Sequence, residues 1–406
     1  MSHITYDVII KRGNETLCGK NANNRFPATI LQGLFSSEKS VDFIESLVVQ
    51  ELEYGTFNAQ EIWSLLAEAC DHNYPDLADK LMKEFYSNKS GVEAVRGLEP
   101  PVLVLAAGRG MTNIVETLLQ KGEHPEQIDS QGRWPFVWAV YKGQLAVVKL
   151  LLKDRRTRPN GREIAGRTAL MLAIQERHID VITYLIGEPK VDINIKDYAG
   201  RTAMHYAIDA RMVDVCIRMI KNAPPEDNFG DDDGMTVLSY AAAGGLVKVV
   251  KALKKRAEAK IIDINAPCKV HGYTALHYAV VYADSVTVRH PHLANDAYDT
   301  IAAVLSICGI DVNQRNRKGE TALECAASRG HVPVMKALLK HEDIKVSYRV
   351  WRLLSFFAPI KKLTTLEESK IGFRIMSPLR PWMQKESKRA LDQSDVYQRL
   401  IPQPDP

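Results

Sequence analysis

A short motif returns along this chain of 406 residues at a fixed interval. It consists of Gly, a variable residue, Thr, a small or apolar residue and then Leu or Met, and its clear copies begin at Gly166, Gly200, Gly234, Gly272 and Gly319. A degraded copy begins at Gly132, and the steps from Gly132 to Gly166, Gly200 and Gly234 are each 34 residues. Such a repeat indicates one supersecondary unit, copied and stacked, because a single unit cannot bury its apolar face alone.

The motif resembles the signature of ankyrin repeats. That signature reads T-P-L-H-x-A and returns every 33 residues, and residues 202–207 and 274–279 match it with Ala in place of Pro. The resemblance implies a short first helix, a Gly-His-like turn and a second helix in each unit, as in residues 326–340. It covers about residues 99–345 and implies seven units.

Elementary physical chemistry supports the same fold. In residues 147–152 and 249–253 the apolar side chains cluster at helical spacing, with polar side chains on the other face. Small residues such as Ala173 and Ala207 allow neighbouring first helices to approach closely. The Gly of each motif suits a tight turn with positive φ, and the following Thr can cap the amide groups of the next helix.

The sequence therefore predicts an all-α, ankyrin-like solenoid with short β-hairpin fingers and helical caps at both ends. Residues 1–57 are predicted to be a non-repeat cap, with a strand at 6–10 and a helix at 41–53. Residues 58–98 are predicted to be a divergent helical pair, whose first helix begins with the capping residues Asn58 and Glu61.

The repeat array is predicted to span residues 99–345, and residues 346–406 to hold a cap helix and a proline-containing tail. One unit is longer than the others, and its extra residues, 285–297, are expected to lie between its two helices as a loop on the binding side.

Composition narrows the class of partner. Lys and Arg number 53 and Asp and Glu 49, a net charge of +4, so a dedicated nucleic-acid binder is not expected. No apolar run reaches the length of a membrane span, and no signal peptide is recognised at the start. The six cysteines have no close pair, which predicts free thiols in the cytoplasm or nucleus, buried at the apolar positions Cys216, Cys308 and Cys325.

No motif for catalysis, cofactor binding or metal binding is recognised. His290 and His292 lie near Asp296, but no cysteine or third histidine stands at a ligand spacing, so a polar loop is the better interpretation. The resemblance implies that His205 and His277 are structural and stiffen the fingers. We therefore expect no enzyme, no cofactor and no metal ion.

The resemblance implies that partners bind a concave surface formed by the fingers and the first helices. The variable positions there are the residue after the motif Gly and the two before the helix–helix turn. Together with the finger-tip residue Tyr198, they give the candidates Arg133, Tyr141, Lys142, Arg167, Glu176, Tyr198, Arg201, Asp209, Tyr273, Tyr282 and Arg329. Aromatic residues and arginine often dominate binding energy, which favours Tyr141, Tyr198, Arg201, Tyr273 and Tyr282.

The expected function is non-enzymatic recognition of one or more proteins by a monomeric intracellular adaptor or regulatory cofactor, with a transcription coregulator as the favoured form. A substrate adaptor of a ubiquitin ligase is the alternative, and it requires the N-terminal cap or the tail to bind a ligase scaffold. Basic clusters at 153–162 and 251–260 fit either nuclear import or an acidic partner. An enzyme would need its chemistry in the short terminal segments.

Overall fold

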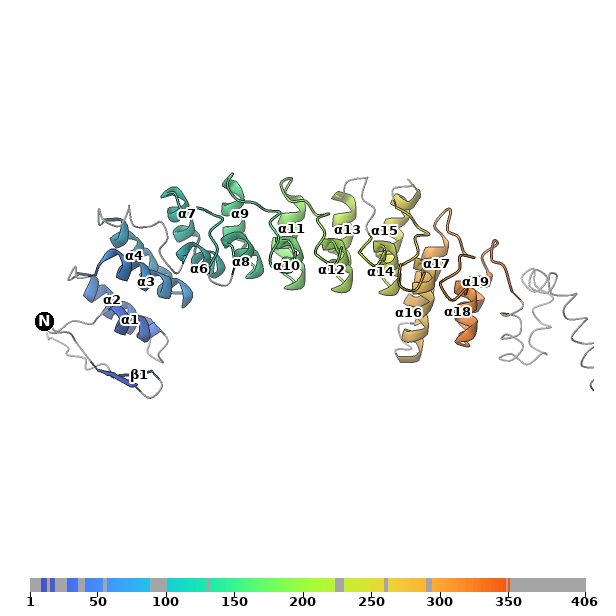
Figure 1. Cartoon of the computed structure of the whole chain (residues 1–406), viewed down its shortest axis with the longest axis horizontal. Helices are drawn as coiled ribbons and strands as arrows, with labels where there is room; N and C mark the ends of the chain where they lie inside the picture. Colours follow the sequence, from blue (N-terminus) through green and yellow to red (C-terminus); the bar gives the residue numbers. More distant parts are fainter. Residues whose placement is uncertain are drawn as a thin grey trace, which may run out of the picture. The chain divides into compact units, whose positions relative to one another are not determined.

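The computed structural model describes residues 9–12, 15–18, 28–35, 41–53, 57–87, 101–129, 132–222, 230–258, 262–289, 294–347 and 350. The chain divides into two compact units, Met1–Ala210 and Arg211–Pro406. Within each unit, pairs of helices follow one another along the chain (Figure 1). No helix in the described ranges is both long enough and apolar enough to cross a membrane.

The first unit begins with an antiparallel β-hairpin, in which Ile9 pairs with Cys18 and Arg12 with Glu15. The predicted strand is thus present from Ile9 on, and residues 6–8 lie outside the described ranges. The elements of this unit are β1 (Ile9–Arg12), β2 (Glu15–Cys18), α1 (Ala28–Phe35), α2 (Val41–Glu53), α3 (Ala59–Asp71), α4 (Pro75–Ser87), α6 (Val102–Arg109), α7 (Thr112–Gln120), α8 (Pro135–Tyr141), α9 (Leu145–Lys153), α10 (Ala169–Gln175), α11 (Ile179–Gly187) and α12 (Ala203–Asp209).

Helix α3 and helix α4 form the divergent pair that the sequence predicts. The side chain of Asn58 accepts the backbone N–H of Glu61 at 2.9 Å, and the Glu61 carboxylate accepts the Asn58 N–H at 2.9 Å. Helix α3 packs against α6 and α4 packs against α7. This pair therefore stacks on the next one in the same way as the later pairs of the unit, first helix on first helix and second on second.

The second unit repeats this arrangement. Its elements are α13 (Val213–Asn222), α14 (Val237–Ala243), α15 (Val247–Glu258), α16 (Ala275–Arg289), α17 (Ala294–Leu305), α18 (Ala322–Ser328) and α19 (Val332–Leu339). Helix α14 packs against α16 and α16 against α18, while α13 packs against α15, α15 against α17, and α17 against α19. First helices and second helices thus form two parallel rows within the unit.

Thr residues begin the first helices as the motif predicts. Thr236 Oγ1 accepts the Ser239 N–H at 3.2 Å, and Thr321 Oγ1 accepts the Glu324 N–H at 3.2 Å. Each bond satisfies an amide group that has no partner inside the helix. The motif glycines Gly166 and Gly200 have φ values of 78° and 73°, which is the left-handed conformation expected for them.

The predicted loop at 285–297 is wrong for most of its length. Helix α16 continues to Arg289 and α17 begins at Ala294, so the extra residues mainly lengthen two helices. Val286 is buried at the extended end of α16, and Ala297 is buried in α17. Because these apolar side chains lie against the neighbouring helix, the added segment gains more from continuing the helices than from forming a loop.

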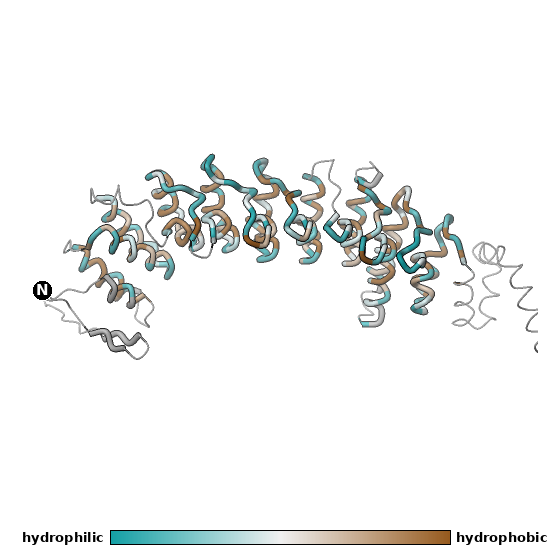
Figure 2. Tube along the Cα trace, viewed as in Figure 1, coloured by the Kyte–Doolittle hydropathy of each residue, from teal (hydrophilic) through white to brown (hydrophobic). Residues whose placement is uncertain are grey.

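The core of each unit lies between the helices, where Ala, Val, Leu and Ile side chains predominate. Figure 2 shows hydrophobic residues along the helices and hydrophilic residues along many of the connecting loops.

Cys70, Cys216, Cys268 and Cys325 are buried free thiols, whereas Cys308 is exposed. The prediction for Cys308 was wrong because α17 ends at Leu305, which leaves Cys308 in the following turn rather than on an apolar helix face. The predicted cap helix at 350–357 and the tail lie outside the described residues, apart from Val350.

Candidate functional site

The fingers of the first unit hold arginine side chains at one repeated position. Arg133, Arg167 and Arg201 are spaced by 34 residues, and each forms an ion pair with a carboxylate four residues earlier. The same carboxylate closes the finger, as Asp197 Oδ1 does by accepting the Arg201 backbone N–H at 2.8 Å. The finger turn thus holds each arginine side chain through a carboxylate of the same finger.

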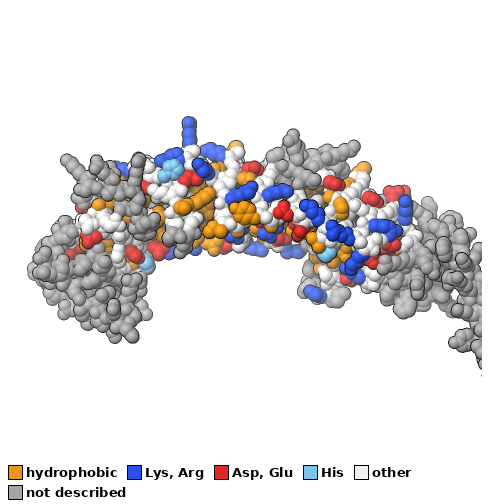
Figure 3. All heavy atoms as spheres, viewed as in Figure 1, with side chains coloured by type: hydrophobic (Ala, Val, Ile, Leu, Met, Phe, Trp, Pro, Cys, Tyr) orange, Lys and Arg blue, Asp and Glu red, His pale blue; other side chains and the backbone are white. Residues whose placement is uncertain are grey.

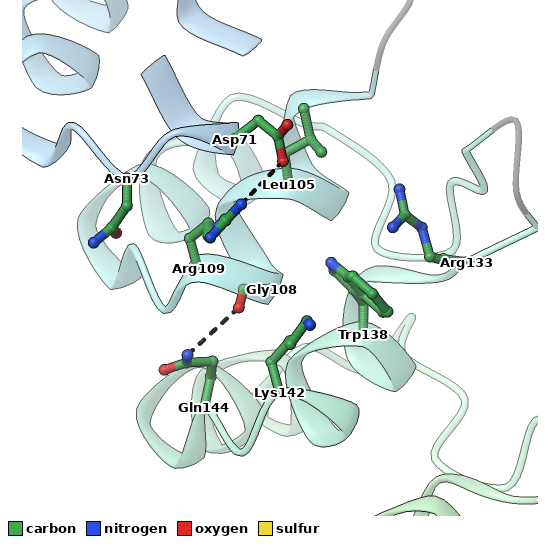
Figure 4. Close-up of a pocket in the computed structure, with 9 residues that line it drawn as sticks. All are labelled: Asp71, Asn73, Leu105, Gly108, Arg109, Arg133, Trp138, Lys142 and Gln144. Carbon is green, nitrogen blue, oxygen red and sulfur yellow. Dashed lines mark hydrogen bonds and ion pairs between the residues drawn. The ribbon is translucent and has the colours of Figure 1, made fainter. Parts of the chain in front are cut away.

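Around Trp138 lies a cavity of about 440 Å³, which we call the Trp138 pocket. It is lined by Asp71, Asn73, Leu105, Gly108, Arg109, Arg133, Trp138, Lys142 and Gln144 (Figure 4). The Arg133 guanidinium carbon lies 4.3 Å from the centre of the indole ring and the Lys142 Nζ lies 4.8 Å from it. Both distances fit cation–π contacts.

Tyr141 and Gln144 support the Trp138 pocket. The Tyr141 ring stacks on Trp138, with centroids 5.2 Å apart and planes 9° apart. The Gln144 side-chain amide donates to the Gly108 carbonyl at 3.4 Å, and Arg109 contacts Asp71 at 3.4 Å. The pocket therefore joins three consecutive helix pairs of the first unit, with residues from the α3–α4 turn, from α6 and from α8 with its flanking segments.

A second cavity of about 450 Å³ lies in the same unit, and we call it the Tyr198 pocket. Its lining residues are Ala165, Arg167, Gln175, Asp197, Tyr198, Ala199, Arg201 and Tyr206. Arg167 donates to Gln175 at 2.7 Å, and Arg201 donates to the Tyr206 hydroxyl at 2.8 Å. Tyr198 is 69% exposed at the finger tip, so its ring contributes apolar surface there.

Asp197 is the anionic centre of the Tyr198 pocket. Burial alone would raise its pKa, but hydrogen bonds from the Tyr206 hydroxyl and from the backbone N–H groups of Arg201 and Ala199 outweigh burial and lower the pKa below its ordinary value. Burial and the bond to Asp197 in turn raise the pKa of Tyr206 to about 12. Asp197 therefore stays charged and Tyr206 stays protonated near neutral pH.

The structure brings six of the predicted residues into these two places. Arg133 and Lys142 line the Trp138 pocket with Tyr141 stacked behind them, and Arg167, Tyr198 and Arg201 line the Tyr198 pocket. Glu176 and Asp209 lie exposed at the C-terminal ends of α10 and α12.

The other three predicted residues belong to the second unit. Tyr273 is half-buried and stacks on His277, with ring centroids 5.5 Å apart. Tyr282 packs so closely on Gly245 that a Cβ there would lie 2.2 Å from its ring. Arg329 pairs with Asp284 at 3.6 Å. Both tyrosines thus contribute to packing within the unit.

His205 and His277 hold the backbone, as the resemblance implied. Nδ1 of His205 accepts the Thr202 N–H at 3.0 Å, and Nδ1 of His277 accepts the Thr274 N–H at 3.3 Å. Both side chains are buried. In the described part of the chain, no group of three or more His, Cys, Asp or Glu side chains is placed to hold a metal ion. The histidines at 290 and 292 lie outside that part.

Sequence comparison assigns the repeats to a family. The family model for ankyrin repeats in three copies matches residues 66–163, 157–228 and 216–289, and the model for a single ankyrin repeat matches residues 318–349. The chain belongs to the ankyrin-repeat family. The match covers more than half of the chain and begins within α3, so the ankyrin array includes part of the divergent helical pair. No curated protein sequence matches the chain.

Solved structures of ankyrin proteins resemble this chain in part. The ankyrin repeat domain of Bcl-3, described as a unique member of the IkappaB family, has 19% identity and a TM-score of 0.44, over 52% of this chain and 91% of that domain. The ankyrin repeat protein EF0377 has 24% identity and a TM-score of 0.44, over 51% and 97%. A chain from the complex of the Bd0816 endopeptidase of Bdellovibrio bacteriovorus with immunity protein Bd3460 has 26% identity and a TM-score of 0.39, over 53% and 100%.

Sequence reasoning missed Trp138, Gly108 and Tyr206. The repeat spacing contains a signal for two of them, because Trp138, Leu172, Tyr206 and Tyr240 follow one another at intervals of 34 residues. Tyr206 and Tyr240 each donate a hydrogen bond of 2.8 Å to the finger carboxylate nine residues earlier. Trp138 and Leu172 do not have this hydroxyl, so the tyrosine bond to the finger carboxylate is confined to the Tyr206 and Tyr240 repeats among these four.

Proposed function

We propose that this chain is a non-enzymatic adaptor or regulatory cofactor that binds a partner protein through the first-unit ankyrin repeats. The observation that carries the proposal is the row Arg133, Arg167 and Arg201, each held by its finger carboxylate beside a pocket. A rigid surface with fixed arginines and an exposed aromatic ring has the composition of protein-binding hot spots. The family consists of interaction modules, which supports the same conclusion.

The test is affinity purification from the native cell followed by mass spectrometry. The natural chain is compared with a Tyr198→Ala/Glu176→Ala variant, because both side chains are exposed and lie outside the Trp138 pocket. A Lys336→Ala/Lys340→Ala variant serves as the control, since these exposed lysines lie at α19 in the second unit. Circular dichroism first checks that all three proteins fold equally.

We expect a partner that the natural chain and the α19 control both recover and that the Tyr198 variant loses. Equal recovery by all three proteins would exclude Tyr198 and Glu176 as partner-binding residues and would count against binding at that end of the first-unit surface. The identity of the partner then separates a coregulator, which binds transcription factors, from an adaptor of another kind.

A transcription coregulator must also reach the nucleus, and the basic helix α15 offers a test. Lys251 and Lys255 are exposed on α15, whereas Arg256 donates to the Ile220 carbonyl at 2.8 Å. A Lys251→Ala/Lys255→Ala variant therefore removes positive charge without removing that bond. Loss of nuclear accumulation supports the coregulator form of the proposal, and unchanged accumulation removes the basic helix as its import signal.

A further inference from the structure

The Trp138 pocket has an excess of positive charge at its lining. Arg109, Arg133 and Lys142 line it, and Asp71 is its one lining carboxylate. Asp71 pairs with Arg109 and Asp129 pairs with Arg133, but Lys142 forms no ion pair with any carboxylate among the described residues. The pocket therefore retains a cation that is not neutralised by the protein itself.

Lys142 is held in place although it is exposed. Its Nζ lies 4.8 Å from the Trp138 ring centre and 5.3 Å from the Tyr141 ring centre. Two aromatic contacts favour one position of a side chain that is otherwise mobile. Figure 4 shows its ammonium end near Trp138, with the indole nitrogen directed toward the space between Lys142 and Arg109. Among the described residues, no acceptor is found for that indole N–H.

The Tyr198 pocket lacks this excess of charge. Its arginines are both paired with carboxylates, and Arg201 is additionally bonded to Tyr206. Tyr206 itself donates to Asp197 at 2.8 Å. The two pockets have nearly the same volume, but only in the Trp138 pocket do a lysine ammonium and an indole N–H both remain available to a ligand among the described residues.

These groups select an anionic ligand with some apolar surface. The ammonium, the guanidinium groups and the indole N–H are all hydrogen-bond donors that favour a negatively charged acceptor. The Leu105 side chain and the Trp138 ring at the lining favour a ligand that also carries methylene groups. A nucleic acid would need a continuous basic track, whereas acidic and basic side chains are interspersed on the face shown in Figure 3.

We propose that the Trp138 pocket binds the carboxylate of an aspartate or glutamate side chain from an acidic segment of a partner protein. This inference rests on the proposed function and names the chemistry of the partner at one place. Lys142 forms the ion pair, the indole N–H of Trp138 donates to the same carboxylate, and the Leu105 and Trp138 side chains contact the side-chain methylene groups. Arg109, on helix α6 of the preceding helix pair, adds positive charge to the pocket.

The test observes Trp138 directly in the full-length chain. The five tryptophans of the chain give five indole N–H signals in a ¹H–¹⁵N spectrum, and the Trp138→Phe variant identifies the signal of Trp138. The probe is N-acetylated, C-amidated hexaglutamate at low salt, and hexaglutamine is the uncharged control. We expect hexaglutamate to shift the Trp138 signal saturably and hexaglutamine to leave it in place.

Two lysine variants test the named ion pair. Lys142→Ala should weaken hexaglutamate binding about tenfold, because a charge-assisted hydrogen bond is removed. Lys149→Ala should leave binding unchanged, although Lys149 is also exposed and lies 5.4 Å from the ring centre of Tyr184. Equal weakening by the two substitutions, or none by Lys142→Ala, overturns the inference.

Inorganic phosphate is the third probe, and it separates a carboxylate site from a general anion site. If phosphate shifts the Trp138 signal at the same concentration as hexaglutamate and displaces it, the pocket is not selective for an acidic protein segment and the inference fails. A missing hexaglutamate shift also overturns it. Loss of a partner by the Tyr198→Ala/Glu176→Ala variant would still support the proposed function in either case, because those residues lie outside this pocket.

Discussion

Trp138 lies directly against the backbone of Gly108. A Cβ added at Gly108 would lie 2.1 Å from both Cδ1 and Nε1 of the indole, far inside any normal contact. Gly108 is the penultimate residue of α6, in its last turn, where glycine still has a lower helix propensity than alanine. Its presence there is explained by the position of the indole, since any larger residue would displace the ring from the Trp138 pocket.

We predict that Gly108→Ala moves Trp138 and destabilises the first unit by about 1 kcal/mol. The overlap between the new Cβ and the Trp138 indole costs about 1–3 kcal/mol. The higher helix propensity of alanine offsets about 1 kcal/mol of this cost. Near-ultraviolet circular dichroism reports the indole, and urea unfolding reports the stability. Gly187→Ala is the matched control at the end of α11, because nothing lies within 4 Å of its added Cβ. Identical spectra and stability for the two variants would contradict the prediction.

Tyr206→Phe should destabilise the protein by about 1–3 kcal/mol, because it removes a hydrogen bond to the buried, charged Asp197. The Tyr206 hydroxyl lies 2.8 Å from Asp197 Oδ2, and the Asp197 side chain is 3% exposed. Tyr184→Phe, whose hydroxyl lies 3.4 Å from Glu188 Oε2, should change the free energy of unfolding by less than about 0.5 kcal/mol. Thermal or urea unfolding of both variants measures the contrast, and equal losses would show that Asp197 does not depend on Tyr206.

His277 should make the stability of the second unit depend on pH. Its Nε2 lies 3.1 Å from the Glu320 carbonyl oxygen, and burial lowers its pKa from the ordinary value although the Glu320 carbonyl acts in the opposite direction. The unfolded chain binds a proton below about pH 6.5 while the folded chain stays neutral. The stability is therefore complete above that pH and falls below it, by at most about 1.4 kcal/mol per pH unit until the folded pKa is reached.

The measurement compares the natural chain with His277→Gln by urea unfolding at pH 7.5 and pH 5.5. Other titrating groups affect both proteins alike, so the difference in unfolding free energy between them isolates His277. We expect that difference to shrink at pH 5.5. A difference that stays constant between the two pH values would mean that His277 does not titrate differently in the folded and unfolded states.

The same substitution at two adjacent residues of α15 should change the free energy of unfolding by different amounts. Arg256→Ala removes the 2.8 Å hydrogen bond to the Ile220 carbonyl near the end of α13, and a loss of about 1–3 kcal/mol follows. Lys255→Ala alters an exposed side chain and should stay within about 0.5 kcal/mol of the natural chain. Thermal unfolding of both variants tests this. Comparable stability would show that Arg256 does not join the two helices energetically.

Much of the fold could be predicted because the same sequence features recur in successive repeats. The 34-residue period, the glycines at the turns and the Thr caps are local features, and the structure places Gly166, Gly200 and Thr321 as expected. The segment at 285–297 could not be predicted in the same way. Its helices depend on packing between α16 and α17, which no neighbouring repeat shows in its sequence.

The candidate site could be predicted only in part for a related reason. Arg133, Arg167 and Arg201 follow a motif glycine and are visible in the alignment of the repeats. Their ion pairs and the two pockets depend on side chains from adjacent repeats, as with Gly108 and Trp138. Sequence spacing places residues on an element, but it does not reveal which side chain of the next element fills the space beside them.

The regular spacing of the finger arginines would let a partner bind the array in more than one register. A side chain bound in the Trp138 pocket would fix one of these registers. A partner that matched Arg167 would meet an almost identical finger after sliding by one repeat to Arg133 or Arg201. The positions equivalent to Trp138 in the next two repeats are Leu172 and Tyr206, so sliding would carry an anchored side chain away from its indole. A partner held there has one permitted alignment on the array, and that alignment determines which of its residues reaches Tyr198.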